Sequence, residues 1–146
     1  MNIGLRVLTC VRLRLRPSIE TAIREADIVV DGICPECGRV LTEEEIRRGW
    51  TNDPYDFTTR CVDCGHRFHA GLIVSGNPDV LSIGHFGYLC PLQVFTGLKD
   101  LLAATGRSNL GLKFLMNQRP DLFWNLRRHY GSYRRGQATF RTWLDT

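Results

Sequence analysis

The sequence reads C-P-E-C-G at residues 34–38 and C-V-D-C-G at residues 61–65. Each Cys-x-x-Cys pair is followed by a glycine, Gly38 or Gly65, which can adopt the positive φ of a tight metal-binding turn. Four thiolates so arranged can close a tetrahedron around Zn²⁺. The predicted zinc ligands are Cys34, Cys37, Cys61 and Cys64.

Two disulfides or four free thiols are the alternatives for these cysteines. Proline and glycine in the turns favour a metal over a crosslink, although the insert between the pairs is longer than the commonest Cys₄ spacing. Six cysteines in a zinc pattern indicate an intracellular, reducing compartment, either cytoplasmic or mitochondrial. The remaining two, Cys10 and Cys90, lie among apolar residues and are expected to be buried thiols.

The composition is that of an ordinary globular domain, with 43% hydrophobic residues in 146 and a net charge of +4. One domain, or a metal domain with an appendage, fits this length. No apolar run approaches membrane-spanning length. Nearly all the basic residues are arginine, which suits phosphate and carboxylate partners. The base composition of a genome can also produce such an excess of arginine over lysine, without any such partner.

The first nineteen residues contain arginines but no acid, as mitochondrial presequences do. However, V-R-L-R-L-R at residues 11–16 alternates strictly, which predicts a half-buried strand that ends at Pro17. A short helix is expected over 18–26 with Ser18 as its N-cap. A strand over 27–33 then leads to the first cysteine pair.

Between the cysteine pairs, Thr42 and Glu45 form a capping-box pattern for a helix that ends at Gly49. The run of three glutamates at 43–45 resembles a catalytic carboxylate cluster, but the start of a helix explains it. Strands are predicted over 57–60 and 67–74. Three aromatic residues are expected to pack around the metal-binding lobe: Trp50, Phe57 and Phe68.

Residues 75–79 form the clearest break, and helical periodicity follows it. A first helix should begin at Pro91 and end at Gly106, and a second should run from an N-cap at Ser108 to about residue 118. The third, opened by Pro120, should cover 121–130 and end at Gly131. Its predicted apolar face comprises Leu122, Phe123, Leu126 and Tyr130, extended by Trp124.

The predicted fold class is therefore α+β, a Cys₄ zinc ribbon with a small antiparallel sheet and a helical C-terminal half. The expected organisation is 1–74 for the N-terminal strands and ribbon, 75–131 for a connecting strand and three helices, and 132–146 for a basic tail.

Other candidate sites are weaker. His66 and His69 follow the second cysteine pair and are alternative ligands, although such residues more often flank a ribbon. Cys90 with His85 is a conceivable nucleophile and base, but no third group or nucleophile elbow accompanies them. There is no glycine-rich phosphate loop.

Arginines interleaved with aromatic residues occur at 127–130 and 133–135 and can hold phosphates and stack on bases. The end of a solvated helix or an acidic protein partner explains them slightly better than RNA does. The candidate contacts to RNA or an acidic partner are Arg12, Arg14, Arg16, Arg127, Arg128, Arg134 and Arg135.

One set of residues around the cysteines forms a familiar pattern: Cys34-x-x-Cys37, Leu41, Glu44-Glu45-Ile46, Gly49-Trp50, Asp53, Thr58-Thr59, Cys61-x-x-Cys64 and Phe68. It resembles the zinc-ribbon segment near the C-terminus of a DENN-domain family, the Rab exchange factors once described as c-Myc-promoter-binding proteins. The run P-D-L-F-W-N-L at 120–126 resembles that family's HP-x-x-FWNL helix, with Arg119 in place of its histidine. Residues 87–102 also look like the intervening stretch, so the resemblance covers roughly 28–131.

The resemblance implies the fold of an accessory segment and the same four cysteine ligands. Exchange activity in that family belongs to an upstream DENN module, which 146 residues cannot hold, so Rab exchange is not implied. We expect a non-enzymatic zinc-binding structural or adaptor subunit of a larger protein assembly, with no small-molecule substrate. The alternative is an RNA-binding component of a ribonucleoprotein such as an organellar ribosome.

Overall fold

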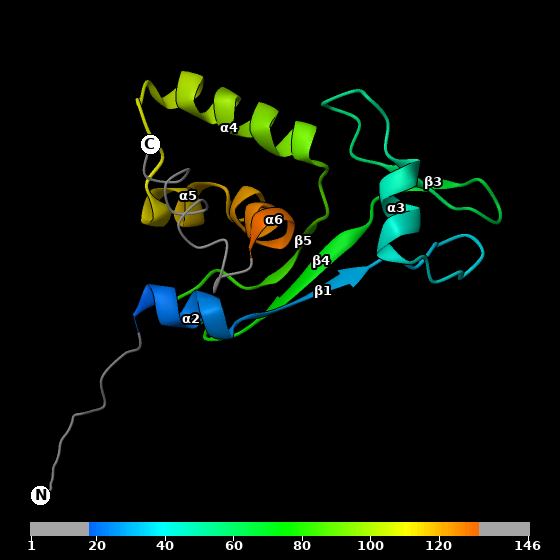
Figure 1. Ribbon diagram of the computed structural model, residues 1–146, viewed down its shortest axis with the longest axis horizontal. Coiled ribbons are helices and arrows are strands. Elements are labelled where there is room, and N and C mark those ends of the chain that lie inside the picture. The colour runs from blue at the N-terminus through cyan, green and yellow to red at the C-terminus, as the bar shows by residue number, and fades with distance from the viewer. Residues whose placement is uncertain (1–17, 132–146) are drawn as a thin grey trace, which may run out of the picture.

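The computed structural model describes residues 18–131, which form a mixed α+β fold (Figure 1). The helices in this range are α2 (Ile19–Glu25), α3 (Glu43–Gly49), α4 (Pro91–Thr105), α5 (Leu112–Gln118) and α6 (Pro120–Tyr130). The strands are β1 (Asp27–Asp31), β2 (Thr59–Arg60), β3 (Arg67–Phe68), β4 (Gly71–Ser75) and β5 (Gly84–Gly87). The predicted fold class is confirmed. The predicted strand at 11–16 and the basic tail at 132–146 lie outside the described residues.

The larger sheet is antiparallel, with β4 between β1 and β5. Side chains alternate between its two faces. Leu72 and Val74 are buried on the face against which α6 packs, whereas Val29 and Ile73 pair on the opposite, exposed face. β4 crosses the boundary predicted between residues 74 and 75. It pairs with β1, which precedes this boundary, and with β5, which follows it.

The metal lobe, residues 32–70, projects from one end of this sheet and carries α3 and the two-stranded sheet β2–β3 (Figure 1). The single strand predicted over 67–74 is wrong, because β3 pairs with β2 while β4 joins β1 in the other sheet. The chain changes sheets at His69 and Ala70. A Cβ on Gly71 would lie 2.6 Å from the His85 ring, so a glycine here lets β4 approach β5.

The helical lobe, residues 91–131, largely follows the sequence expectations. α4 begins at Pro91 and ends before Gly106, whose φ of 68° is left-handed. The predicted cap at Ser108 is wrong: α5 begins later, with Gly111 at its N-cap. Leu110, which precedes this cap, is buried in the core, and the extended backbone of Gly111 leads from it into the helix.

α6 is the most deeply buried helix of the described range. Its residues from Leu122 to Leu126 are at most 2% exposed. Trp124 belongs to this core and donates its indole N–H to the Ser82 carbonyl at 2.8 Å. Two aromatic expectations are wrong, since Tyr130 is 41% exposed and Phe57 is 40% exposed.

Candidate metal centre

The two Cys-x-x-Cys-Gly segments form the same turn twice. In the first, the Cys34 amide donates to the Arg39 carbonyl at 2.9 Å and the Gly38 amide to the Cys34 carbonyl at 2.9 Å. The second repeats both bonds one for one, with Cys61 and Gly65 in the corresponding places. Gly38 and Gly65 have φ of 79° and 76°, a left-handed conformation that any side chain would strain.

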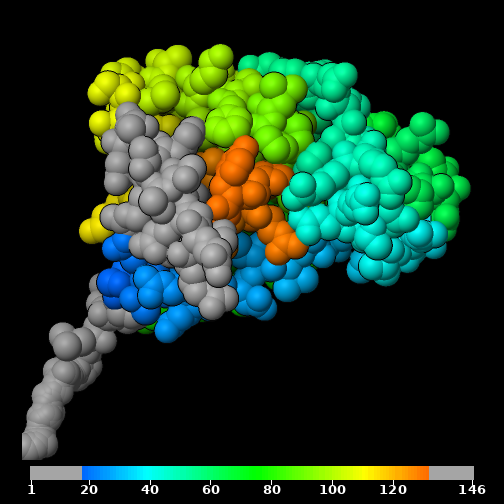
Figure 2. Space-filling model, in the orientation of Figure 1, coloured from blue at the N-terminus to red at the C-terminus, as the bar shows by residue number. Residues whose placement is uncertain are grey.

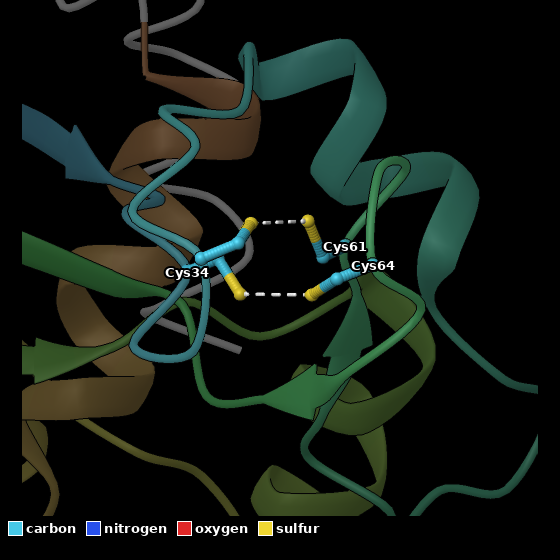
Figure 3. A group of neighbouring side chains, drawn as sticks. Cys34, Cys61 and Cys64 are labelled. Carbon is cyan, nitrogen blue, oxygen red and sulfur yellow. Dashed lines mark hydrogen bonds between the residues drawn. The ribbon is translucent and has the colours of Figure 1, made fainter.

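The turns face each other and bring the four predicted sulfur ligands together (Figure 3). All four Sγ atoms lie within 4.8 Å of one another, and the Cys34–Cys64 and Cys37–Cys61 pairs are each 3.6 Å apart. A tetrahedral metal site with metal–sulfur bonds of about 2.3 Å requires sulfurs about 3.8 Å apart. The cluster therefore fits a metal ion held by four thiolates.

The disulfide alternative does not fit these sulfurs. A disulfide bond is about 2.05 Å long, and all four cysteines are free thiols in the structure. Cys34 and Cys61 are buried, whereas Cys37 and Cys64 are exposed. One side of the cluster is thus closed by protein and the other lies at the surface.

Backbone amides point at the sulfurs and affect their ionisation. The Cys64 and Asp63 amides lower the pKa of Cys61 to about 7. The His66 amide acts in the same direction on Cys64, but burial and the neighbouring thiols outweigh it and raise the pKa of Cys64 to about 12. Neighbouring sulfurs therefore cannot all ionise at neutral pH, and a metal cation entering the cluster displaces protons.

Arg39 connects the two turns. Its guanidinium forms a bidentate pair with Asp63 of the second turn, at 3.0 and 3.1 Å. It also binds Glu45 of α3 at 2.9 Å. Glu45 completes the predicted capping box, because its carboxylate accepts from the Thr42 amide at 2.9 Å and its own amide donates to the Thr42 hydroxyl at 3.2 Å.

Glu43 joins the metal lobe to the helical lobe, which sequence reasoning did not predict. Arg128 of α6 reaches its two oxygens at 2.5 and 3.1 Å, Arg47 donates at 3.4 Å, and the buried Tyr88 hydroxyl also donates to it. The Arg128 bond, followed by that of Tyr88, lowers the pKa of Glu43 to about 2. The surfaces of α6 and the metal lobe meet in Figure 2.

Three aromatic rings pack together beside this ion pair, and Tyr88 is the one that bonds to Glu43. Tyr88 stacks on His129 with ring centroids 5.6 Å apart and meets Trp50 edge-on at 5.0 Å. Burial raises the pKa of Tyr88 to about 12 and lowers the pKa of His129. The His129 ring donates from Nε2 to the Leu89 carbonyl at 2.6 Å. Trp50 packs here as expected of a residue near the metal lobe.

Asn125 is a second unforeseen contact. It is fully buried in α6, and its side chain accepts from the Leu89 amide at 2.7 Å and donates to the Gly87 and Asp121 carbonyls. The asparagine thus satisfies the backbone where β5 ends and the chain turns towards α4. In the sequence, the feature that could have indicated this role is a polar residue inside an otherwise apolar helical stretch.

The remaining candidates fall elsewhere. The metal-compatible cluster in residues 18–131 contains the four cysteines and neither His66 nor His69. His85 pairs with Asp31 at 3.2 Å, while Cys90 precedes α4 and its amide donates to Gln93 at 3.1 Å. The structure therefore shows no nucleophile–base pair between His85 and Cys90 in the described residues.

Two of the seven arginines predicted to contact RNA or an acidic partner lie within the described residues. Arg128 binds Glu43 and the Ile28 carbonyl, and Arg127 donates to the Gly131 carbonyl. Both are engaged within the protein. The other predicted contacts lie outside the described residues: Arg12, Arg14, Arg16, Arg134 and Arg135.

Comparison with known proteins gives no family. No family model, no curated protein and no solved structure matches the chain. Across residues 18–131, every helix is too short or too polar to cross a membrane.

Proposed function

We propose that this chain is a non-enzymatic zinc protein that serves as a structural or adaptor subunit of a larger intracellular protein assembly. The observation that carries the proposal is the cluster of four sulfurs within 4.8 Å, built by two matching turns. Zinc prefers four thiolates in structural sites, and four protein ligands leave no coordination position for a substrate.

The links around the cluster support a structural role for the metal. Arg39 ties the two turns to each other and to α3, and Glu43 ties α3 to α6. Zinc would hold the turns together, and these ion pairs would carry that order into the helical lobe. A reduced zinc site suits a cytoplasmic or mitochondrial location.

Affinity isolation of the tagged full chain from its native cells, with and without nuclease, tests the proposal. Recovery of a defined set of proteins at fixed stoichiometry after nuclease supports a subunit role. Recovery dominated by RNA and lost on nuclease treatment supports the RNA-binding alternative instead. Co-purification of a Rab or a DENN-bearing chain would extend the family resemblance to trafficking.

A further inference from the structure

The three-stranded sheet has an exposed face on the side opposite α6. Val29 of β1 and Ile73 of β4 stand directly opposite each other in the register, and they are 50% and 43% exposed. On the same face, the His85 ring of β5 lies over Gly71, where a Cβ would be 2.6 Å from it, and contacts the Asp31 carboxylate at 3.2 Å. The face therefore has an aliphatic centre with a carboxylate beside it.

The elements that form and border this face carry an excess of acids. α2, β1, β4 and β5 contain one arginine, Arg24, and four acids: Glu20, Glu25, Asp27 and Asp31. Two arginines approach the start of β1 from α6, but Arg128 is neutralised by Glu43, and Arg127 donates to the Gly131 carbonyl. An occupant that matches this face is therefore both apolar and basic.

The N-terminal segment of the chain, residues 1–17, has this chemistry. It contains four arginines and no acid, and Val11, Leu13 and Leu15 alternate with arginines. In an extended chain this alternation places the three aliphatic side chains on one side. The long arginine side chains can reach round to carboxylates at the rim of the surface that the aliphatic side chains cover.

The segment is also joined to the fold at a place from which it can reach this face. It enters α2 at Ser18, and α2 leads directly into β1 at the end of the sheet away from the metal lobe (Figure 1). α2 is about 10 Å long at 1.5 Å per residue, whereas residues 11–17 span about 23 Å when extended. The segment is therefore long enough to double back past α2 and lie over β1.

Other occupants match the face less well. Two copies of the chain stacked through it would bring the acids of one copy against those of the other, because β1, β4 and β5 carry no lysine or arginine. RNA would be repelled by the same acids. A basic segment of another protein has the right chemistry but lacks the high effective concentration of a segment joined to the same chain.

We propose that residues 11–16 cover the exposed face of the three-stranded sheet, with their aliphatic side chains against Val29 and Ile73 and their arginines beside the acids of α2 and β1. The inference goes beyond the proposed function and does not rest on it. It gives the three arginines of this run a partner within the chain rather than in RNA or in another protein.

Paramagnetic NMR on the full zinc-loaded chain tests the contact. In a Cys90→Ser chain, Cys10 is the one thiol outside the metal cluster and can carry a nitroxide. We expect the nitroxide to broaden the methyl signals of Val29 and Ile73 more than those of Val62, a similarly exposed valine of the metal lobe. Equal broadening at the two places, or no broadening, overturns the proposal.

A mixing experiment identifies the chain whose segment binds. Isotope-labelled chain without nitroxide is mixed with unlabelled chain that carries the nitroxide at Cys10. We expect the Val29 and Ile73 methyl signals to stay sharp in this mixture. Broadening as strong as that within one chain would assign the face to a segment of a second copy and overturn the proposal.

Trypsin cleavage within residues 11–16 gives a second readout that needs no label. Val29→Thr with Ile73→Thr removes aliphatic surface without changing the charge. It should speed this cleavage about tenfold, because proteolysis follows the population of the open form. Val40→Thr with Val62→Thr makes a similar change at exposed positions of the metal lobe and should speed it by less than about twofold. Equal cleavage rates in the two double variants overturn the proposal.

Discussion

Replacing Glu43 by glutamine should destabilise the protein, because the ion pair between α3 and α6 depends on its charge. The pKa of Glu43 falls from 4.5 to about 2. At about 1.36 kcal/mol for each pKa unit this shift corresponds to about 3 kcal/mol. The Glu43 side chain retains 28% exposure, so solvent screening reduces the expected loss to about 1–2 kcal/mol.

Glu44→Gln is the matched control. Glu44 is the next residue of the same helix and is exposed. Its substitution removes the same charge from the same first turn. Urea unfolding of the zinc-loaded proteins at pH 7 should place Glu43→Gln about 1–2 kcal/mol below Glu44→Gln. Equal free energies of unfolding for the two variants would refute the reasoning.

The pH dependence gives the same prediction a second readout. Because the folded-state pKa of Glu43 is depressed, its contribution is complete above about pH 4.5 and is lost as the pH falls towards 2. The stability gap between wild type and Glu43→Gln should therefore shrink in this window. Acid also protonates the thiolates and releases metal from every variant. The test is therefore the difference in the free energy of unfolding between wild type and Glu43→Gln at each pH.

Three further predictions concern single contacts. Arg39→Ala removes the connection between the two turns and should lower zinc affinity about tenfold in a chelator competition, with Lys99→Ala unchanged. Asn125→Leu leaves the Leu89 amide without its partner and should cost about 2–4 kcal/mol in urea unfolding; a loss below about 0.5 kcal/mol would contradict this. Gly49→Ala places a Cβ 2.3 Å from the Thr59 hydroxyl and 2.6 Å from the Arg60 amide and should lower the melting temperature, whereas Gly111→Ala has open space and should not.

Local chemistry in the sequence predicted the parts of the fold that depend on neighbouring residues. The glycines after each cysteine pair, the Thr42–Glu45 capping box and the glycine that ends α4 all appear where the sequence placed them. The break between β3 and β4 could not be predicted, because the sequence of residues 67–74 is compatible with one continuous strand and the change of sheet depends on distant partners.

The same distinction applies to the site. The spacing of the cysteines predicted the sulfur cluster, since each pair forms a local turn. The partners of Glu43 could not be predicted, because Arg128 lies 85 residues away and helix-start chemistry already explains a glutamate there. The role of Asn125 could not be predicted either, because its sequence position is that of an ordinary helix residue. Its partners, the Leu89 amide and the Gly87 carbonyl, lie between β5 and α4 and are distant in the sequence.

Zinc content by elemental mass spectrometry, measured on chain purified without chelators, tests the central claim most directly. We predict one zinc per chain, lost in Cys37→Ser together with cooperative unfolding, and retained in Cys90→Ser, which alters a buried thiol outside the cluster. Full zinc stoichiometry and a native melting curve in Cys37→Ser, or no zinc in the wild-type chain, would contradict the account.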